Sequence, residues 1–144
     1  MRGGRHEATR GILDTSTLLL LGRIDDPALL PDEPAITSVT LAELAVGPLV
    51  ARDPAERARR QAHLQQAEAD FVPLPFDAAA ARAFAGVAVS LRGAGRKVAA
   101  RTYDAMIAAT AISAGLPLYT CNPRDFEGIE GLRLVPVALA STSA

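Results

Sequence analysis

Short apolar stretches alternate with longer helical segments along the whole chain. The apolar stretches predict strands at residues 12–14, 35–38, 71–74, 116–121 and 132–137. The segments between them predict helices at about 15–22, 41–50, 54–70, 77–91 and 102–114. Buried strands separated by helices form parallel sheets with helices on both faces. The pattern therefore predicts a three-layer α/β/α fold with a parallel sheet of about five strands.

A chain of 144 residues is long enough for one domain with its own core. We expect a single domain over 1–144, with a core at about 11–137 and flexible tails at 1–10 and 139–144. The only cysteine, Cys121, excludes an intrachain disulfide and fits a reducing compartment. No apolar run reaches the roughly 18 residues of a membrane span, and the N-terminus lacks a signal peptide's apolar region. These features predict a cytoplasmic protein without membrane contact.

Composition limits how the chain could bind nucleic acid. Aromatic residues make up only 4% of the sequence and tryptophan is absent, which argues against a surface built on base stacking. The formal net charge of −1 gives no overall attraction to a polyanion. Any nucleic-acid binding must therefore come from a local basic patch.

Asp14 directly follows the first apolar strand. A carboxylate beside a dry core is costly unless something compensates its charge. Asp14 could simply cap the helix that follows, but Thr15 or Ser16 could do that without a charge. Asp14 is therefore a candidate metal ligand.

Three further acids are expected on the same rim as Asp14. In a parallel sheet, strand ends and the starts of the next helices share the carboxyl edge, where ligands bind. Glu43 lies in the first turn of the helix after the second strand, Asp104 in the first turn of the helix before the fourth, and Asp125 after the fourth. Each has a simpler explanation: Glu43 could complete a capping box with Thr40, Asp104 could meet the helix dipole, and Asp125 could be a turn residue.

A cluster of four carboxylates requires a compensating charge. Two carboxylates about 4 Å apart repel by roughly 4 kcal/mol at an effective dielectric constant near 20. Such a cluster needs a cation or raised pKa values. Oxygen ligands without His or Cys favour Mg²⁺ or Mn²⁺ over Zn²⁺, and a hard cation on an acidic rim suits phosphodiester hydrolysis.

Four motifs occur in order along the chain: Leu13-Asp14-Thr15-Ser16, Thr40-Leu41-Ala42-Glu43-Leu44-Ala45-Val46-Gly47, Tyr103-Asp104-Ala105-Met106-Ile107-Ala108-Ala109-Thr110-Ala111, and Thr120-Cys121-Asn122-Pro123-Arg124-Asp125-Phe126. With these motifs the chain resembles PIN-domain ribonucleases, and among them the VapC-type toxins of bacterial type II toxin–antitoxin pairs. The resemblance covers about residues 11–137. The last two motifs are specific, whereas the first two alone are weak. The segment 98–101 is more basic than in many relatives.

The resemblance implies a PIN fold with strand order 3-2-1-4-5. It makes Asp14, Glu43, Asp104 and Asp125 an acidic catalytic quartet that binds Mg²⁺ or Mn²⁺, with Asp14 and Asp104 as direct ligands. Three further residues would position water, the scissile phosphate or a second metal: Thr120, Asn122 and Ser16.

The resemblance also implies partners. Family members form homodimers, and a cognate VapB-type antitoxin holds them inactive in heterotetramers or larger assemblies. The substrate would be RNA, and a basic link that returns the chain to the acidic rim offers candidate RNA contacts: Arg92, Arg96, Lys97 and Arg101. A merely solvated loop explains these residues equally well. The segment 54–70 could form part of a groove for a partner helix or simply face water.

The expected activity is endonucleolytic cleavage of single-stranded or looped RNA. One alternative is a catalytically silent PIN-fold module that binds RNA or protein, although a complete quartet argues against it. Another is a different Mg²⁺-dependent phosphoryl-transfer domain, such as a receiver. A receiver needs an acid directly after the third strand, and here none occurs before Asp77. We expect Cys121 in the core, His63 on the surface and His6 in the N-terminal tail, all without a chemical role.

Overall fold

The computed structural model describes residues 7–141. The strands are β1 (Arg10–Leu13), β2 (Glu33–Ala35), β3 (Leu118–Thr120) and β4 (Leu134–Pro136). The α-helices are α1 (Thr15–Leu19), α2 (Ser38–Val46), α3 (Pro54–Asp70), α4 (Ala78–Gly93) and α5 (Thr102–Ala114). Short 3₁₀ turns connect them: η1 (Leu21–Arg23), η2 (Pro27–Leu29), η3 (Gly47–Val50), η4 (Val98–Arg101) and η5 (Pro123–Phe126).

The sheet is parallel, with the order β2-β1-β3-β4. It has four strands where the sequence predicted about five. The predicted strand at 71–74 is reduced to a single parallel bridge between Leu74 and Thr37, which follows β2. Pro73 and Pro75 flank this bridge and have no N–H to donate, so a longer ladder cannot form. Because the bridge pairs with the chain that continues β2, the family's predicted strand order is otherwise preserved.

Helices cover both faces of the sheet, as predicted. Successive strand residues point to opposite faces. On one face, Ile12 and Leu118 pack against α4 and α5, and on the other, Leu13 and Tyr119 pack with Leu18 of α1. The fold is therefore the expected three-layer α/β/α arrangement.

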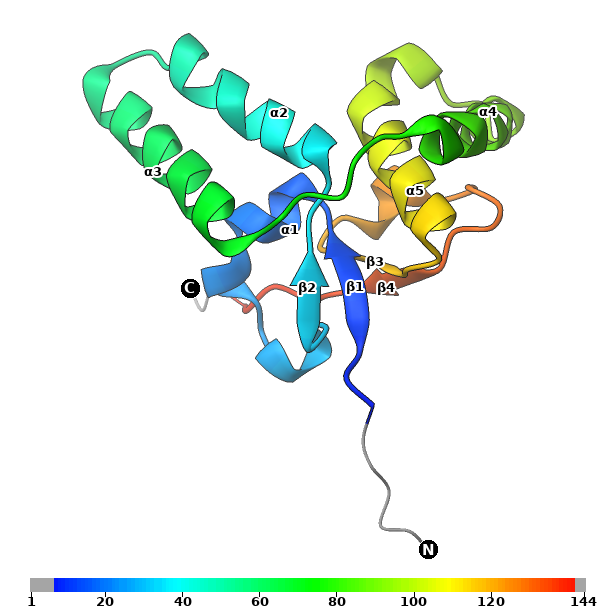
Figure 1. The fold of residues 1–144 in the computed structure, drawn as a ribbon, viewed down its shortest axis with the longest axis horizontal. Helices are drawn as coiled ribbons and strands as arrows, with labels where there is room; N and C mark the ends of the chain where they lie inside the picture. Colours follow the sequence, from blue (N-terminus) through cyan, green and yellow to red (C-terminus); the bar gives the residue numbers. More distant parts are fainter. Residues whose placement is uncertain (1–6, 142–144) are drawn as a thin grey trace, which may run out of the picture.

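Helices α2 and α3 form an arm on one side of the molecule, and α4 and α5 form a second arm on the other, with α1 between them (Figure 1). Inside the first arm, Ile36, Leu44 and Ala67 make a separate small core. Arg60 of α3 also donates a hydrogen bond from Nη1 to the Gly47 carbonyl oxygen at 2.9 Å. The first arm thus has its own packing and carries Glu43.

The start of α2 differs from the prediction. Thr37, rather than Thr40, caps the helix, because the Thr37 hydroxyl accepts a hydrogen bond from the Thr40 N–H at 3.2 Å. Helix α2 therefore begins at Ser38, which places Glu43 in the second turn rather than the first. The predicted capping box between Thr40 and Glu43 is wrong, so this simpler explanation of Glu43 does not apply. The Ser38 N–H bonds to the Leu74 carbonyl, which fixes the early start.

Hydrogen bonding extends further toward both ends than the predicted tails allowed. The Thr9 N–H donates to Asp32 Oδ2 at 3.0 Å, and the Ala140 N–H donates to the Arg23 carbonyl at 2.8 Å. The rest of the two predicted tails, including His6, lies partly outside the described residues. Within residues 7–141, no helix is long and apolar enough to cross a membrane.

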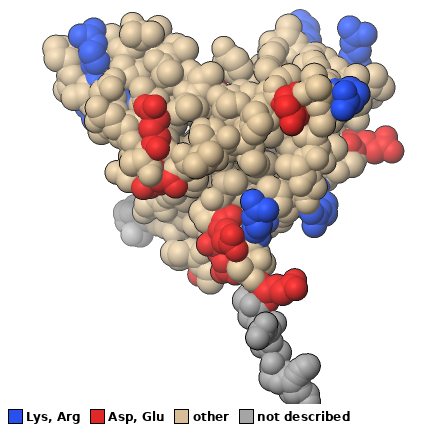
Figure 2. Space-filling model, in the orientation of Figure 1, with Lys and Arg blue, Asp and Glu red and all other residues tan. Residues whose placement is uncertain are grey.

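Charged side chains are scattered around the periphery of the face shown in Figure 2, with mostly uncharged surface between them. This distribution matches the near-zero net charge of the sequence. On this face, basic and acidic side chains are interspersed rather than gathered into one basic patch.

Candidate functional site

Asp14 lies between β1 and α1 and is only 3% exposed. Its Oδ1 accepts hydrogen bonds from the Thr17 N–H at 3.2 Å and from the Thr17 hydroxyl. Its Oδ2 accepts from the Thr120 hydroxyl at 2.9 Å and from the Ser16 hydroxyl at 3.3 Å. Asp14 therefore does cap α1, and the same contacts hold its charge and fix its orientation in a dry position.

The end of β3 lies beside Asp14 because β1 and β3 are neighbouring parallel strands. Thr120 is fully buried at this end and accepts a hydrogen bond from the Asn122 N–H at 2.9 Å. The Asn122 side-chain amide donates to the Ser16 hydroxyl at 2.9 Å. The three predicted supporting residues thus form one hydrogen-bonded group around Asp14.

Thr17 belongs to the same group, although the sequence analysis did not single it out. Besides its contacts with Asp14, its hydroxyl accepts a hydrogen bond from the Cys121 N–H at 2.9 Å. Thr17 is the third residue after a capping Asp, the position whose N–H such a cap usually binds. That spacing was a signal in the sequence, but the contact with Cys121 required the fold.

Glu43 reaches the site from α2. The Thr15 hydroxyl donates to Glu43 Oε1 at 2.7 Å, and the Thr40 hydroxyl lies 2.9 Å from the Thr15 hydroxyl. Partial burial raises the pKa of the Glu43 carboxyl, the Thr15 hydrogen bond opposes that rise, and the charge of Asp14 adds to it. Glu43 and Asp14 are therefore close enough to interact electrostatically.

Asp104 is the point at which the four acids converge. It lies in the first turn of α5, as predicted. Its pKa is raised to about 6, mainly by burial and further by the negative charges of Asp125, Asp14 and Glu43. The nearby Arg101 guanidinium acts in the opposite direction. Four carboxylates from four separate segments thus share one electrostatic environment.

Asp125 lies in η5 and forms an ion pair with Arg101. The distance between Arg101 Nη1 and Asp125 Oδ1 is 2.7 Å, and each side chain is about one-third exposed. This pairing places Arg101, a predicted RNA contact, at the acidic site itself. Asp125 is consequently the one member of the quartet with a cationic partner among the described residues.

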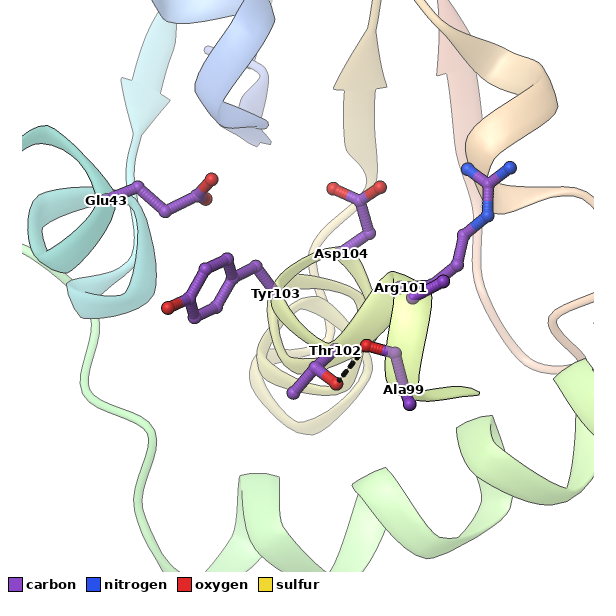
Figure 3. Close-up of a pocket in the computed structure, with 7 residues that line it drawn as sticks. Glu43, Ala99, Arg101, Thr102, Tyr103 and Asp104 are labelled. Atoms are coloured by element: carbon purple, nitrogen blue, oxygen red, sulfur yellow. Dashed lines mark hydrogen bonds between the residues drawn. The ribbon is translucent and has the colours of Figure 1, made fainter. Parts of the chain in front are cut away.

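A pocket of about 540 Å³ opens beside two of the four acids, Glu43 and Asp104. It is lined by Glu43, Ala99, Ala100, Arg101, Thr102, Tyr103 and Asp104. Figure 3 shows Glu43 from α2 and Asp104 from α5 projecting toward the same space, with the Tyr103 ring beside Glu43. Glu43 also lines a second pocket of about 260 Å³, with Arg60 and His63 on its wall.

The donor set suits a hard divalent cation. Carboxylates and hydroxyls surround the site. Burial and then the crowding of like charge raise the pKa of Asp104, so a cation would relieve repulsion. Among residues 7–141, no three Asp, Glu, His or Cys side chains are already arranged to hold a metal ion. Mg²⁺ usually retains several waters and binds to one or two protein carboxylates, so it does not need such a preformed cluster.

The other predicted basic residues lie in different settings. Arg92 and Lys97 are exposed. The Arg96 side chain is only 21% exposed, and its Nη2 lies 3.6 Å from Glu127 Oε2. Arg92 and Lys97 are therefore freer to meet a polyanion than Arg96 is.

The cysteine and one histidine lie where the sequence placed them. Cys121 packs partly buried against the small core that contains Leu13 and Tyr119. His63 is exposed on α3. Neither side chain takes part in the hydrogen-bonded group around Asp14, which Cys121 joins only through its backbone N–H.

The chain matches the family model for the PIN domain over residues 12–132. It is 43% identical over 129 residues to Ribonuclease VapC5 of Mycobacterium tuberculosis, covering 88% of this chain and 93% of the relative. It is 30% identical over 131 residues to Ribonuclease VapC of Rickettsia bellii, covering 89% of this chain and 96% of the relative.

Solved structures give the same grouping. A crystal structure of VapBC-5 from Mycobacterium tuberculosis, a member of the VapBC family of toxin–antitoxin systems, contains a chain with a TM-score of 0.77 and 40% identity. That match covers 90% of this chain and 99% of the other. A DNA-bound VapBC from Salmonella typhimurium matches with a TM-score of 0.65 and 27% identity, covering 89% of this chain and 97% of the other.

Proposed function

Because this chain belongs to the PIN-domain family and, within it, to the VapC ribonucleases, we propose that it is a divalent-metal-dependent endoribonuclease and the toxin of a toxin–antitoxin pair. The observation that carries the proposal is the convergence of three other carboxylates on Asp104, whose pKa is raised to about 6 by burial and by these charges together. Such a cluster opposes its own ionisation unless a cation is bound. Asp14, Glu43, Asp104 and Asp125 would hold Mg²⁺ or Mn²⁺.

The acids at the site would have different roles in the reaction. Bound Mg²⁺ or Mn²⁺ would supply an activated water and offset negative charge on the scissile phosphate. Asp14 cannot reorient easily, because hydrogen bonds hold both of its oxygens. Glu43 has a raised pKa and opens onto the pocket, so it is suited to accept a proton from the attacking water.

Arg101 and the hydroxyl group around Asp14 would orient the substrate. Arg101 lines the pocket and is paired with Asp125, so its guanidinium can also meet a phosphate oxygen. Ser16, Asn122 and the buried Thr120 would help to position water or the phosphate through the hydrogen-bonded group around Asp14. The substrate is RNA, so we expect the protein to act in the cytoplasm.

An antitoxin would bind beside this site. Relatives of this chain occur in structures of VapBC complexes. A pocket of about 130 Å³ between α1, η1 and α3 is lined in part by Leu18, Leu19, Leu21 and Phe71. Leu19 and Leu21 are 41% and 37% exposed, which suits an apolar partner helix from an antitoxin of the VapB type. We expect the toxin itself to form a homodimer in the complex.

Cleavage of a mixture of cellular RNAs tests the metal-dependent activity. The wild-type protein should cleave with Mn²⁺ or Mg²⁺ and stop after chelation. Asp14→Asn should reduce the cleavage rate by more than roughly 100-fold. A smaller loss is usual when the mutated residue only supports a metal ligand and does not bind the metal itself. Asparagine can still cap α1, so thermal unfolding should show a folded variant. Full activity after thorough chelation, or an active Asp14→Asn variant, would contradict the proposal.

A further inference from the structure

We propose that Thr40 and Thr15 are positioning residues that hold Glu43 toward the pocket that it shares with Asp104, an inference that rests on the proposed function. Neither threonine is needed to cap a helix with its side chain, because Asp14 caps α1 and Thr37 caps α2. Their hydroxyls nevertheless form a continuous chain of contacts that ends on the Glu43 carboxylate. This arrangement is the observation to be explained.

The direction of these hydrogen bonds follows from the chemistry of the groups. An ionised carboxylate can only accept, so Thr15 must donate to Glu43 Oε1 over the 2.7 Å distance. Each hydroxyl carries one proton, so Thr15 has none left for Thr40. Thr40 must therefore donate to Thr15 over the 2.9 Å distance. The result is a one-way relay from Thr40 through Thr15 to Glu43.

The position of the relay makes it more than a surface contact. Thr40 is fully buried, so no water competes for its hydroxyl. Thr40 and Glu43 lie three residues apart on α2 and share a helix face. Thr15 comes from α1 and directly follows Asp14. The relay thus links α2, which carries Glu43, to the start of α1, where Thr15 directly follows Asp14.

The Glu43 side chain borders two pockets. It lines both the pocket that contains Asp104 and the pocket that contains Arg60 and His63. Thr15 lines the second pocket too, and the Arg60 guanidinium there is already paired with Glu56 and with the Gly47 carbonyl oxygen. Without the Thr15 hydroxyl, Glu43 would lose the one hydrogen bond that its carboxylate makes among the described residues, and it would be free to turn within either pocket. The relay therefore limits the orientations open to the Glu43 carboxylate.

Direct Mn²⁺ binding, measured as free Mn²⁺ by electron paramagnetic resonance on the full chain without RNA, tests this inference. Thr40→Val and Thr15→Val should each weaken Mn²⁺ binding about 10-fold, the scale of losing a group that orients a metal ligand. Thr15→Ser keeps the hydroxyl and should bind like wild type. The double variant should bind no more weakly than Thr15→Val alone, because one relay is broken once.

Thr110→Val is the matched control. Thr110 is buried on α5 and donates to the Met106 carbonyl within its own helix, so its loss tests a buried hydroxyl without the relay. Equal Mn²⁺ affinities for Thr40→Val and Thr110→Val, or failure of Thr15→Ser to restore binding, would overturn the inference. Asp14→Asn separates the two proposals. If Asp14→Asn loses Mn²⁺ binding while Thr40→Val and Thr15→Val keep it, only the relay is wrong. If Asp14→Asn also keeps it, the metal site itself is wrong.

Discussion

At Asp104, burial and three like charges act in the same direction, and a single arginine opposes them. Ionisation of the Asp104 carboxyl is therefore less favourable in the metal-free folded protein than in the unfolded chain, which lowers the stability of the fold at neutral pH. A folded-state pKa above the ordinary 3.8 means that the stability contributed by this group is fully present below about pH 3.8. It is lost as the pH rises through about 6.

Asp104→Asn should therefore stabilise the metal-free protein at neutral pH. We expect the free energy of unfolding in chelator at pH 7.5 to rise by about 1 kcal/mol, after allowing for solvent screening of a partly exposed group. The gain should shrink below pH 6 and vanish near pH 3.8. Urea unfolding across this pH range measures it.

Added Mn²⁺ supplies the control, because it should stabilise the wild-type protein far more than Asp104→Asn. A variant that is less stable than wild type in chelator at pH 7.5 would show that crowding of charge does not raise the energy of this site.

The four acids could be predicted from the sequence because the ends of strands and the starts of helices are recognisable in the pattern of apolar and polar residues. Asp14 follows an apolar stretch and Asp104 begins a helical one, so topology alone puts both on one edge. The ion pair between Arg101 and Asp125 was not predictable, since 24 residues separate them and only the fold sets their distance. The role of Thr15 was hidden for the same reason.

Among the elements, β1 and β3 meet at an unusually close contact. A Cβ atom on Gly11 would lie 2.2 Å from Cε1 of the Tyr119 ring, far inside contact distance. Tyr119 is mostly buried at 8% exposure, so its ring has little room to move. The absence of a side chain at Gly11 lets these strands bring Asp14 and Thr120 together.

Gly11→Ala should destabilise the protein by about 1–3 kcal/mol, the usual cost of overpacking a core. The measurement is the free energy of unfolding in urea. Gly22→Ala is the matched control, because a Cβ there meets nothing within 4 Å and should change stability by less than about 0.5 kcal/mol. Equal changes in the free energy of unfolding for the two variants would mean that the Tyr119 ring moves aside without destabilising the protein.

The predicted helices and strands were most accurate where the sequence carries strong caps. Helix α3 occupies the predicted range of 54–70, and Gly115 ends α5 in the left-handed conformation as expected. The start of α2 was wrong because Thr37 and Thr40 are equally good caps locally, and only the contact of Ser38 with Leu74 decides between them. Likewise, a strand at 71–74 depended on partners that two prolines could not provide.

For the whole molecule, the balance of charge gives RNA little general attraction. Binding should then depend on a few cations near the acidic pocket. Arg92 and Lys97 are exposed in the segment that leads to η4 and α5, whereas Arg96 is mostly buried. The first two are the better candidates for contacts with phosphates.

Replacing Arg92 and Lys97 with alanine should reduce the salt dependence of RNA binding. Loss of two phosphate contacts should lower the slope of log affinity against log salt by about 1.4 for a single strand. Fluorescence anisotropy in an Asp14→Asn background with chelator avoids cleavage during the measurement.

A matched pair of changes, Arg10→Ala with Arg133→Ala, removes equal charge at the start of β1 and just before β4, the opposite edge of the sheet. An equal loss of slope in both double variants would assign the effect to net charge alone.

The double duty of Asp14 has an evolutionary consequence. The residue that starts α1 is also the first acid of the site, yet asparagine serves equally well as a helix cap. One substitution can therefore silence the chemistry and leave the architecture intact. Descendants of such a chain could persist as inert copies that still engage the inhibitor, diverting it from active toxin.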